Sequence, residues 1–119
     1  MTLYYFYIVL SPAGRVGFGI AANPKERVKQ YTSHSGYIVK FPFVFGGQRT
    51  HAKALERTIK NQYADNIWVI EDWKTEWLND DITVSQLYDY VSTLIKERHL
   101  KLKLVAQDFD ITKELDVSV

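Results

Sequence analysis

The chain has 119 residues, of which 46% are hydrophobic and 24% charged, and its formal net charge at pH 7 is +1. This length and balance are typical of a single globular domain and exclude a disordered or fibrous protein. The absence of cysteine excludes a disulfide scaffold, a thiolate zinc site and a cysteine nucleophile.

The chain is predicted to begin with a β-hairpin and a helix. Residues 3–10 are almost wholly aromatic or β-branched, which favours a buried strand. A turn containing proline and glycine follows, and the alternation over residues 15–20 predicts the second strand. A helix is expected from Asn23 to about His34, because Asn23 is a favoured N-cap residue and Pro24 fits the first helical position.

The middle of the chain predicts a third strand and two further helices. The strand is expected over residues 37–45, closed by two glycines, and Pro42 within it indicates an edge strand or a bulge. The apolar spacing then predicts a helix from Thr50, as its N-cap, to about Tyr63. A Trp-rich segment should follow as irregular structure, and Thr83 begins a third helix in a capping box.

These elements predict an α/β fold with a small central sheet, mixed or antiparallel, in the order β-β-α-β-α and flanked by helices. One domain would occupy residues 1–108. Residues 109–119 would form a loosely held C-terminal tail.

Charge and targeting signals suggest where the protein acts. Bases dominate residues 15–60 and acids dominate residues 65–81, so the first stretch could face a polyanion; the alternative is that both are ordinary solvated surfaces. No segment approaches the roughly 20 apolar residues of a membrane span, and no secretory pattern is visible at the amino terminus. We therefore expect a cytoplasmic protein without a membrane partner.

Glu56 is the first residue with a candidate chemical role. The spacing of Ala52, Ile59 and Tyr63 places it on an otherwise apolar helix face. A carboxylate that leans inward requires a metal ion or a basic partner to offset its desolvation. The alternative is that Glu56 lies at the edge of the apolar stripe and pairs with Lys60, four residues on.

A second candidate group lies on the first helix. Arg27, Tyr31 and His34 are spaced so that they form one polar stripe. A guanidinium presents a planar fork of donors that matches phosphate oxygens, and a neighbouring tyrosine or histidine could move a proton. The alternative is an ordinary solvated helix face.

Five motifs follow one another along the chain: Tyr5-Phe6-Tyr7, Gly17-Phe18-Gly19, Asn23-Pro24-Lys25-Glu26-Arg27, Ala52 with Glu56, and Glu76-Trp77. With the order of elements, these motifs resemble the GIY-YIG nuclease superfamily, in particular its compact branch that is frequent in phage genomes. The resemblance covers roughly residues 3–95. The sequence departs from the family in carrying Tyr5 in place of the first glycine and Gly17 in place of the second-motif tyrosine.

The resemblance implies a metal-dependent endonuclease that hydrolyses DNA phosphodiester bonds in the cytoplasm, that of the host cell if the protein is phage-encoded. It implies that Glu56 holds one Mg²⁺ or Mn²⁺ ion and that Tyr7 lies near the attacking water. Arg27 would neutralise the transition-state phosphate, and Tyr31 occupies a position where the family often carries His or Tyr. Tyr5, on the same strand face as Tyr7, would substitute for the missing tyrosine.

From the strand and helix phase we expect Tyr7, Arg27 and Glu56 to converge on one side of the sheet. Expected contacts with the DNA backbone are Lys25, Lys29, His34, Lys53 and Arg57. Target choice would come from the core itself, a homodimer or a partner protein. Two alternatives stay open: a catalytically weak nucleic-acid-binding or inhibitor module of the same fold, and a protein-interaction domain that uses the Trp-rich segment.

Overall fold

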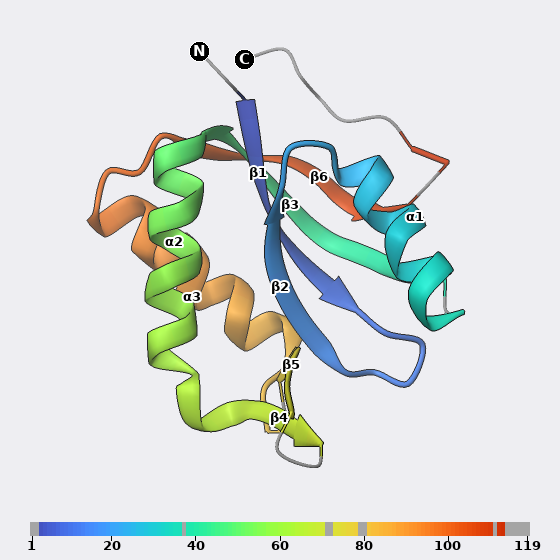
Figure 1. Ribbon diagram of the computed structural model, residues 1–119. Helices are drawn as coiled ribbons and strands as arrows, with labels where there is room; N and C mark the ends of the chain where they lie inside the picture. The colour runs from blue at the N-terminus through green and yellow to red at the C-terminus, as the bar shows by residue number, and fades with distance from the viewer. Residues whose placement is uncertain (1–2, 37, 71–72, 79–80, 111, 114–119) are drawn as a thin grey trace.

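The computed structural model describes residues 3–36, 38–70, 73–78, 81–110 and 112–113 (Figure 1). A six-stranded sheet has the strand order β4-β5-β2-β1-β3-β6, and each neighbouring pair is antiparallel. The strands are β1 (Leu3–Leu10), β2 (Val16–Ala21), β3 (Lys40–Gln48), β4 (Ile67–Ile70), β5 (Trp73–Leu78) and β6 (Leu102–Phe109). The helices are α1 (Pro24–Ser35), α2 (Arg49–Gln62) and α3 (Val84–Glu97), with a short 3₁₀ turn at Ala64–Asn66. The predicted α/β class and the initial β-β-α-β-α order are confirmed.

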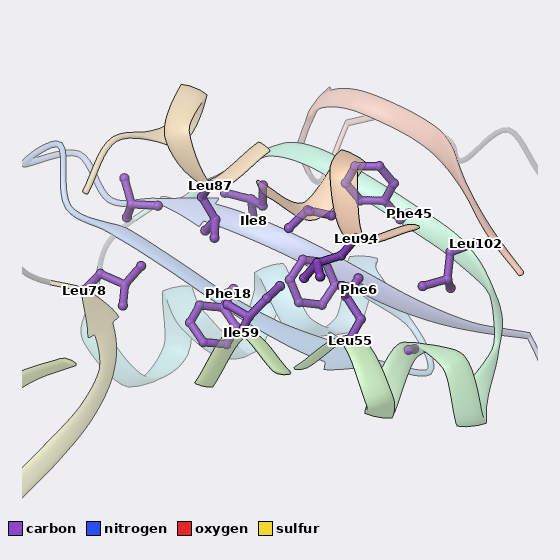
Figure 2. Close-up of a cluster of buried hydrophobic side chains, with 13 residues drawn as sticks. Phe6, Ile8, Phe18, Phe45, Leu55, Ile59, Leu78, Leu87, Leu94 and Leu102 are labelled. Carbon is purple, nitrogen blue, oxygen red and sulfur yellow. The ribbon is translucent and has the colours of Figure 1, made fainter. Parts of the chain in front are cut away.

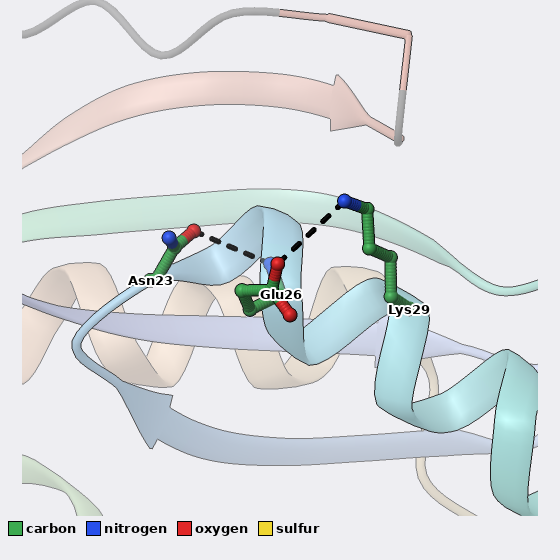
Figure 3. A network of polar contacts seen from close by, with 3 residues as sticks. All are labelled: Asn23, Glu26 and Lys29. Atoms are coloured by element: carbon green, nitrogen blue, oxygen red, sulfur yellow. Dashed lines mark hydrogen bonds and ion pairs between the residues drawn. The ribbon is translucent and has the colours of Figure 1, made fainter.

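The first helix begins where its capping residues predict. The side chain of Asn23 accepts a hydrogen bond from the backbone N–H of Glu26 at 3.2 Å, and Glu26 pairs with Lys29 at 3.6 Å (Figure 3). Gly36 ends the helix in the left-handed conformation, with φ of 74°. These local contacts hold α1 directly after the end of β2.

The sheet is covered on both faces, and β1 lies near its middle. Phe6 and Ile8 point to one face, where they meet the buried side chains of α2 and α3 (Figure 2). Tyr5, Tyr7 and Val9 point to the other face, where they pack with buried residues of α1. We call these the α2 face and the α1 face; Figure 1 shows α2 and α3 on one side of the sheet and α1 on the other.

The third strand is displaced from its predicted position. It runs from residue 40 to residue 48, so the two glycines expected to end it lie inside it. Gly47 is required there because a Cβ atom would collide with the backbone carbonyl of Lys101. β3 is an inner strand, and Pro42 lies at a shift in its register with β1, so the bulge is confirmed and the edge position is wrong. The N-cap of α2 is Gln48 rather than Thr50.

Two further regions differ from expectation. The Trp-rich segment forms β4 and β5 instead of irregular structure. β6 was not predicted, although its first residues alternate between apolar and basic side chains. Phe109, assigned to the expected tail, ends β6, where it pairs with Phe41 and is buried.

No helix in the described part of the chain is long and apolar enough to cross a membrane.

Candidate active site

Three polar side chains meet on the α1 face. The Arg27 guanidinium donates a hydrogen bond through Nη1 to the hydroxyl oxygen of Tyr7 at 3.2 Å. The hydroxyl oxygens of Tyr7 and Tyr31 lie 3.1 Å apart in a second hydrogen bond. β1 supplies the first tyrosine, and α1 supplies the arginine and the second tyrosine four residues on, so one helical turn aligns both with the strand. We call this trio the Tyr7 cluster.

Aromatic packing fixes the rings of the cluster. The Tyr7 ring stacks on Phe41, with centroids 4.3 Å apart and planes at 9°. Tyr31 meets both rings edge-on, at 6.3 Å from Tyr7 and 6.1 Å from Phe41. Trp77 of β5 packs against Tyr31 with centroids 5.8 Å apart. Because stacked and edge-to-face rings have defined orientations, the two hydroxyl groups are held in place before any ligand arrives.

The strand beside Tyr7, β2, carries only glycine and alanine on the face that Tyr7 occupies. Three residues of β2 lie on the α1 face: Gly17, Gly19 and Ala21. They pair directly with the β1 residues that point to that face. Gly19 lies opposite Tyr7, and a Cβ atom there would stand 2.5 Å from the Tyr7 hydroxyl oxygen. Gly17 pairs with Trp77 on its other side. On the side that faces β2, the Tyr7 phenol therefore lies over the backbone of Gly19 and not over a side chain.

The arrangement suits an anion at the guanidinium. Tyr7 is 0% exposed and Tyr31 is buried, whereas Arg27 is half-buried and connects the cluster to solvent. A guanidinium that donates one N–H to a fixed hydroxyl keeps its other donors for oxygens of a phosphate group. The charged guanidinium of Arg27 in turn polarises the hydroxyl group of Tyr7 through their hydrogen bond.

Glu56 is positioned apart from the cluster. It belongs to α2, whose buried residues line the α2 face, so the expectation that it approaches Tyr7 and Arg27 from the same side of the sheet is wrong. Its side chain is 22% exposed, and a carboxylate oxygen lies 3.7 Å from the ammonium nitrogen of Lys60. The alternative interpretation is therefore confirmed: Glu56 lies at the edge of the apolar stripe and pairs with Lys60.

Glu56 would offer a metal ion one carboxylate ligand. No group of three or more His, Cys, Asp or Glu side chains that could hold a metal occurs among the described residues. Magnesium commonly binds through one or two carboxylates together with substrate phosphate oxygens and retained water, so a lone half-buried carboxylate fits this ion. It does not fit zinc, which takes three or four protein ligands.

The expected DNA contacts are divided between two faces. Lys25 and Lys29 lie on α1, and Lys53 and Arg57 lie on α2, on the opposite side of the sheet. They cannot all contact one flat surface. His34 lies in α1, but its side chain is outside the described part of the structure.

Tyr5 is confirmed on the α1 face with Tyr7. Its ring lies against Gly46, where an added Cβ atom would be 2.9 Å from the ring. Sequence reasoning missed Phe41 and Trp77 as supports of the cluster, and it missed the reason for Gly19. A signal was available for the glycine, because Gly17, Gly19 and Ala21 share one face of a strand by the two-residue period.

Comparison with curated proteins and with solved structures finds no match. Residues 3–95 match the T5orf172 domain, a phage-associated domain related to nuclease-like folds. The match spans both strands of the initial hairpin, the Tyr7 cluster and α2. The chain therefore belongs to the T5orf172 domain family.

Proposed function

We propose that this protein is a metal-dependent endonuclease of the GIY-YIG type that hydrolyses phosphodiester bonds in DNA. The observation that carries the proposal is the hydrogen-bonded line from the Arg27 guanidinium through the Tyr7 hydroxyl to the Tyr31 hydroxyl. A cation held against two oriented hydroxyl groups suits a reaction that places extra negative charge on phosphate oxygens.

Each member of the Tyr7 cluster has a distinct role in this proposal. Arg27 binds the non-bridging oxygens of the scissile phosphate and stabilises the charge that they gain in the transition state. Tyr7 orients the attacking water through its hydroxyl, and Tyr31 holds the Tyr7 hydroxyl in position. When bound, a Mg²⁺ or Mn²⁺ ion supplies Lewis-acid stabilisation of the phosphate and its water.

Glu56 would hold that ion from across the sheet, at the edge of β2. Thr58 accepts a hydrogen bond from Arg98, which follows α3, at 3.0 Å, so this flank of α2 faces the end of α3. At 100° per residue, Glu56 lies roughly 160° around the helix from Thr58. Glu56 is therefore on the flank of α2 that faces away from the end of α3. Among the described residues, the pairing of β5 with β2 is confined to Gly17. Figure 1 shows β2 between α2 and α1, and the proposal requires the substrate to reach both helices across this strand.

A second candidate function is a nucleic-acid-binding or inhibitor module that keeps the fold without turnover. The observation that favours it is the complete burial of Tyr7, together with Gly17 at the position of the second-motif tyrosine. In this case Arg27 would bind a phosphate and no water would be activated. Both candidates act on DNA in the cytoplasm, and both leave target choice to the domain itself, a homodimer or a partner protein.

Plasmid nicking in the presence of Mg²⁺ or Mn²⁺ separates the two functions. The nuclease proposal predicts nicking by the wild type and its loss in Arg27→Ala and Glu56→Ala. Glu97→Ala is the matched control, because this exposed carboxylate ends α3 away from the Tyr7 cluster. A wild type that binds duplex DNA but never nicks it would support the binding module, and a wild type that does neither would contradict both.

A further inference from the structure

The outward side of α2 carries a continuous basic stripe, which we call the α2 ridge. Its members are Arg49, Lys53, Arg57 and Lys60. At 100° per residue, these four positions fall within an arc of about 80°. The buried residues Ala52, Leu55 and Ile59 occupy a different sector of the helix.

The ridge keeps most of its charge available to a partner. Arg49, Lys53 and Arg57 are exposed, and the Lys60 side chain is 60% exposed. Lys60 shares its charge with Glu56. Within the described part of the chain, Lys53 and Arg57 enter no ion pair. The Arg49 guanidinium lies over the Tyr4 ring, 5.3 Å from its centroid, and Arg49 stays exposed. Four cations at positions on one side of the helix, with a single acid beside them, form a surface that a polyanion would neutralise.

The dimensions of the ridge match those of a nucleic acid backbone. From residue 49 to residue 60 the helix rises about 16 Å. Along the DNA axis, one strand presents a phosphate roughly every 3.4 Å, so the ridge spans about five base steps. Lys53 and Arg57 are one helical turn apart, and each long side chain can reach a separate phosphate.

The lysines of α1 form a weaker surface. Lys29 is paired with Glu26, which also closes the cap of that helix (Figure 3). Lys25 and Lys29 therefore lie beside an acid in the first turn, on the face of the sheet opposite the ridge. Charge complementarity favours α2 over α1 as the main contact with a duplex.

We propose that the α2 ridge binds the phosphate backbone of duplex DNA, and that it does so independently of the Tyr7 cluster. The inference rests on the proposed function only in taking DNA as the partner. It assigns Arg49 and Lys60 to the interface beside Lys53 and Arg57, and it places the duplex along α2, where it passes Glu56 on the same helix.

The test is duplex binding by two variants that each lose three positive charges. The ridge variant carries Arg49→Gln, Lys53→Gln and Arg57→Gln. The control variant carries Lys96→Gln, Lys101→Gln and Lys103→Gln, exposed residues of α3 and β6 and of the turn between them. Fluorescence anisotropy with a labelled 20-base-pair duplex is measured in EDTA between 50 and 200 mM salt, after thermal melts confirm that both variants fold.

The ridge variant should bind at least roughly tenfold more weakly at 50 mM salt, and the slope of log K against log salt should fall by about 2 to 3, because three phosphate contacts are lost. The control should stay within about twofold of the wild type. Equal losses in both variants, or wild-type binding by the ridge variant, would overturn the inference. A ridge effect in a protein that never cleaves DNA would leave the inference standing and reject the nuclease proposal instead.

Discussion

Gly19 stands opposite Tyr7 in the β1–β2 ladder, and a single methyl group at Gly19 would lie 2.5 Å from the Tyr7 hydroxyl oxygen. That hydroxyl receives a hydrogen bond from Arg27. The absence of one side chain on β2 thus sets the position of the functional oxygen. The hydrogen bond between Arg27 and Tyr7 therefore requires that position 19 carry no side chain.

Gly19→Ala should destabilise the fold by about 1–3 kcal/mol, because the new methyl group would overlap the hydroxyl end of the Tyr7 ring. The effect should be partly relieved when Tyr7→Phe is added, since removal of the hydroxyl removes the closest atom. Chemical denaturation of the two single variants and the double variant measures this coupling. Additive losses would show that the Tyr7 hydroxyl does not lie over Gly19.

Arg27→Lys should lower the rate of DNA cleavage at least about 100-fold while duplex binding changes little. Lysine keeps the charge but loses the planar fork that bonds Tyr7 and a phosphate together, and removal of one preorganised transition-state donor costs about that much. Single-turnover cleavage and anisotropy on the same preparation measure both effects. Arg98→Lys, at an exposed position directly after α3, is the matched control, and equal loss of cleavage in the two variants would show that Arg27 has no special role.

His99→Gly should stabilise the protein by about 0.5–1 kcal/mol. His99 has φ of 51°, in a position where the N–H of Leu100 bonds to the carbonyl of Ile95 at 3.0 Å. This geometry closes α3 in a Schellman motif, and glycine adopts it without the cost that a side chain brings. Urea denaturation compares the variant with Glu97→Gly, which should lose about 1 kcal/mol as a helical glycine. Destabilisation by His99→Gly would mean that the histidine makes a contact of its own.

Tyr63→Phe should flatten the loss of stability at alkaline pH. Burial, and then the neighbouring Tyr90, raise the pKa of Tyr63 above its ordinary value of 10.0. A raised pKa means that the folded state favours the neutral phenol, so this contribution is complete below pH 10 and is lost as pH rises above it. Melts between pH 9 and 11 should show a steeper fall for the wild type than for the variant. Parallel curves would contradict this assignment.

Local signals predicted the elements whose determinants lie within four residues of one another. Asn23 caps α1 as expected, and Thr83 forms the expected capping box of α3 with Gln86, the two hydrogen bonds measuring 3.1 and 2.9 Å. A cap requires only the chain next to it, so sequence spacing is sufficient.

Pairing between distant strands could not be predicted in the same way. β6 joins the sheet through β3, about sixty residues earlier, and only that partner distinguishes it from a polar tail. The position of α2 is also non-local. Periodicity places Glu56 at the margin of an apolar stripe, but the path of the chain after β3 decides which face of the sheet the stripe covers.

The site was predictable where one element determines it. Arg27 and Tyr31 share a helical stripe by their spacing, and the structure brings both to Tyr7. Phe41 and Trp77 come from other strands, and their support of these rings depends on sheet order alone.

The most direct test of the central claim is cleavage by Glu56→Gln measured beside duplex binding and thermal stability. The amide keeps the shape of the side chain but loses the charge that holds a hard divalent cation. Mg²⁺-dependent nicking should fall at least about 100-fold. Binding in EDTA should be unchanged or tighter, and unfolding free energy should change by less than about 0.5 kcal/mol, because an i,i+4 pair with the exposed ammonium group of Lys60 contributes little. Nicking at the wild-type rate would show that Glu56 does not hold the metal, and it would contradict the proposed mechanism.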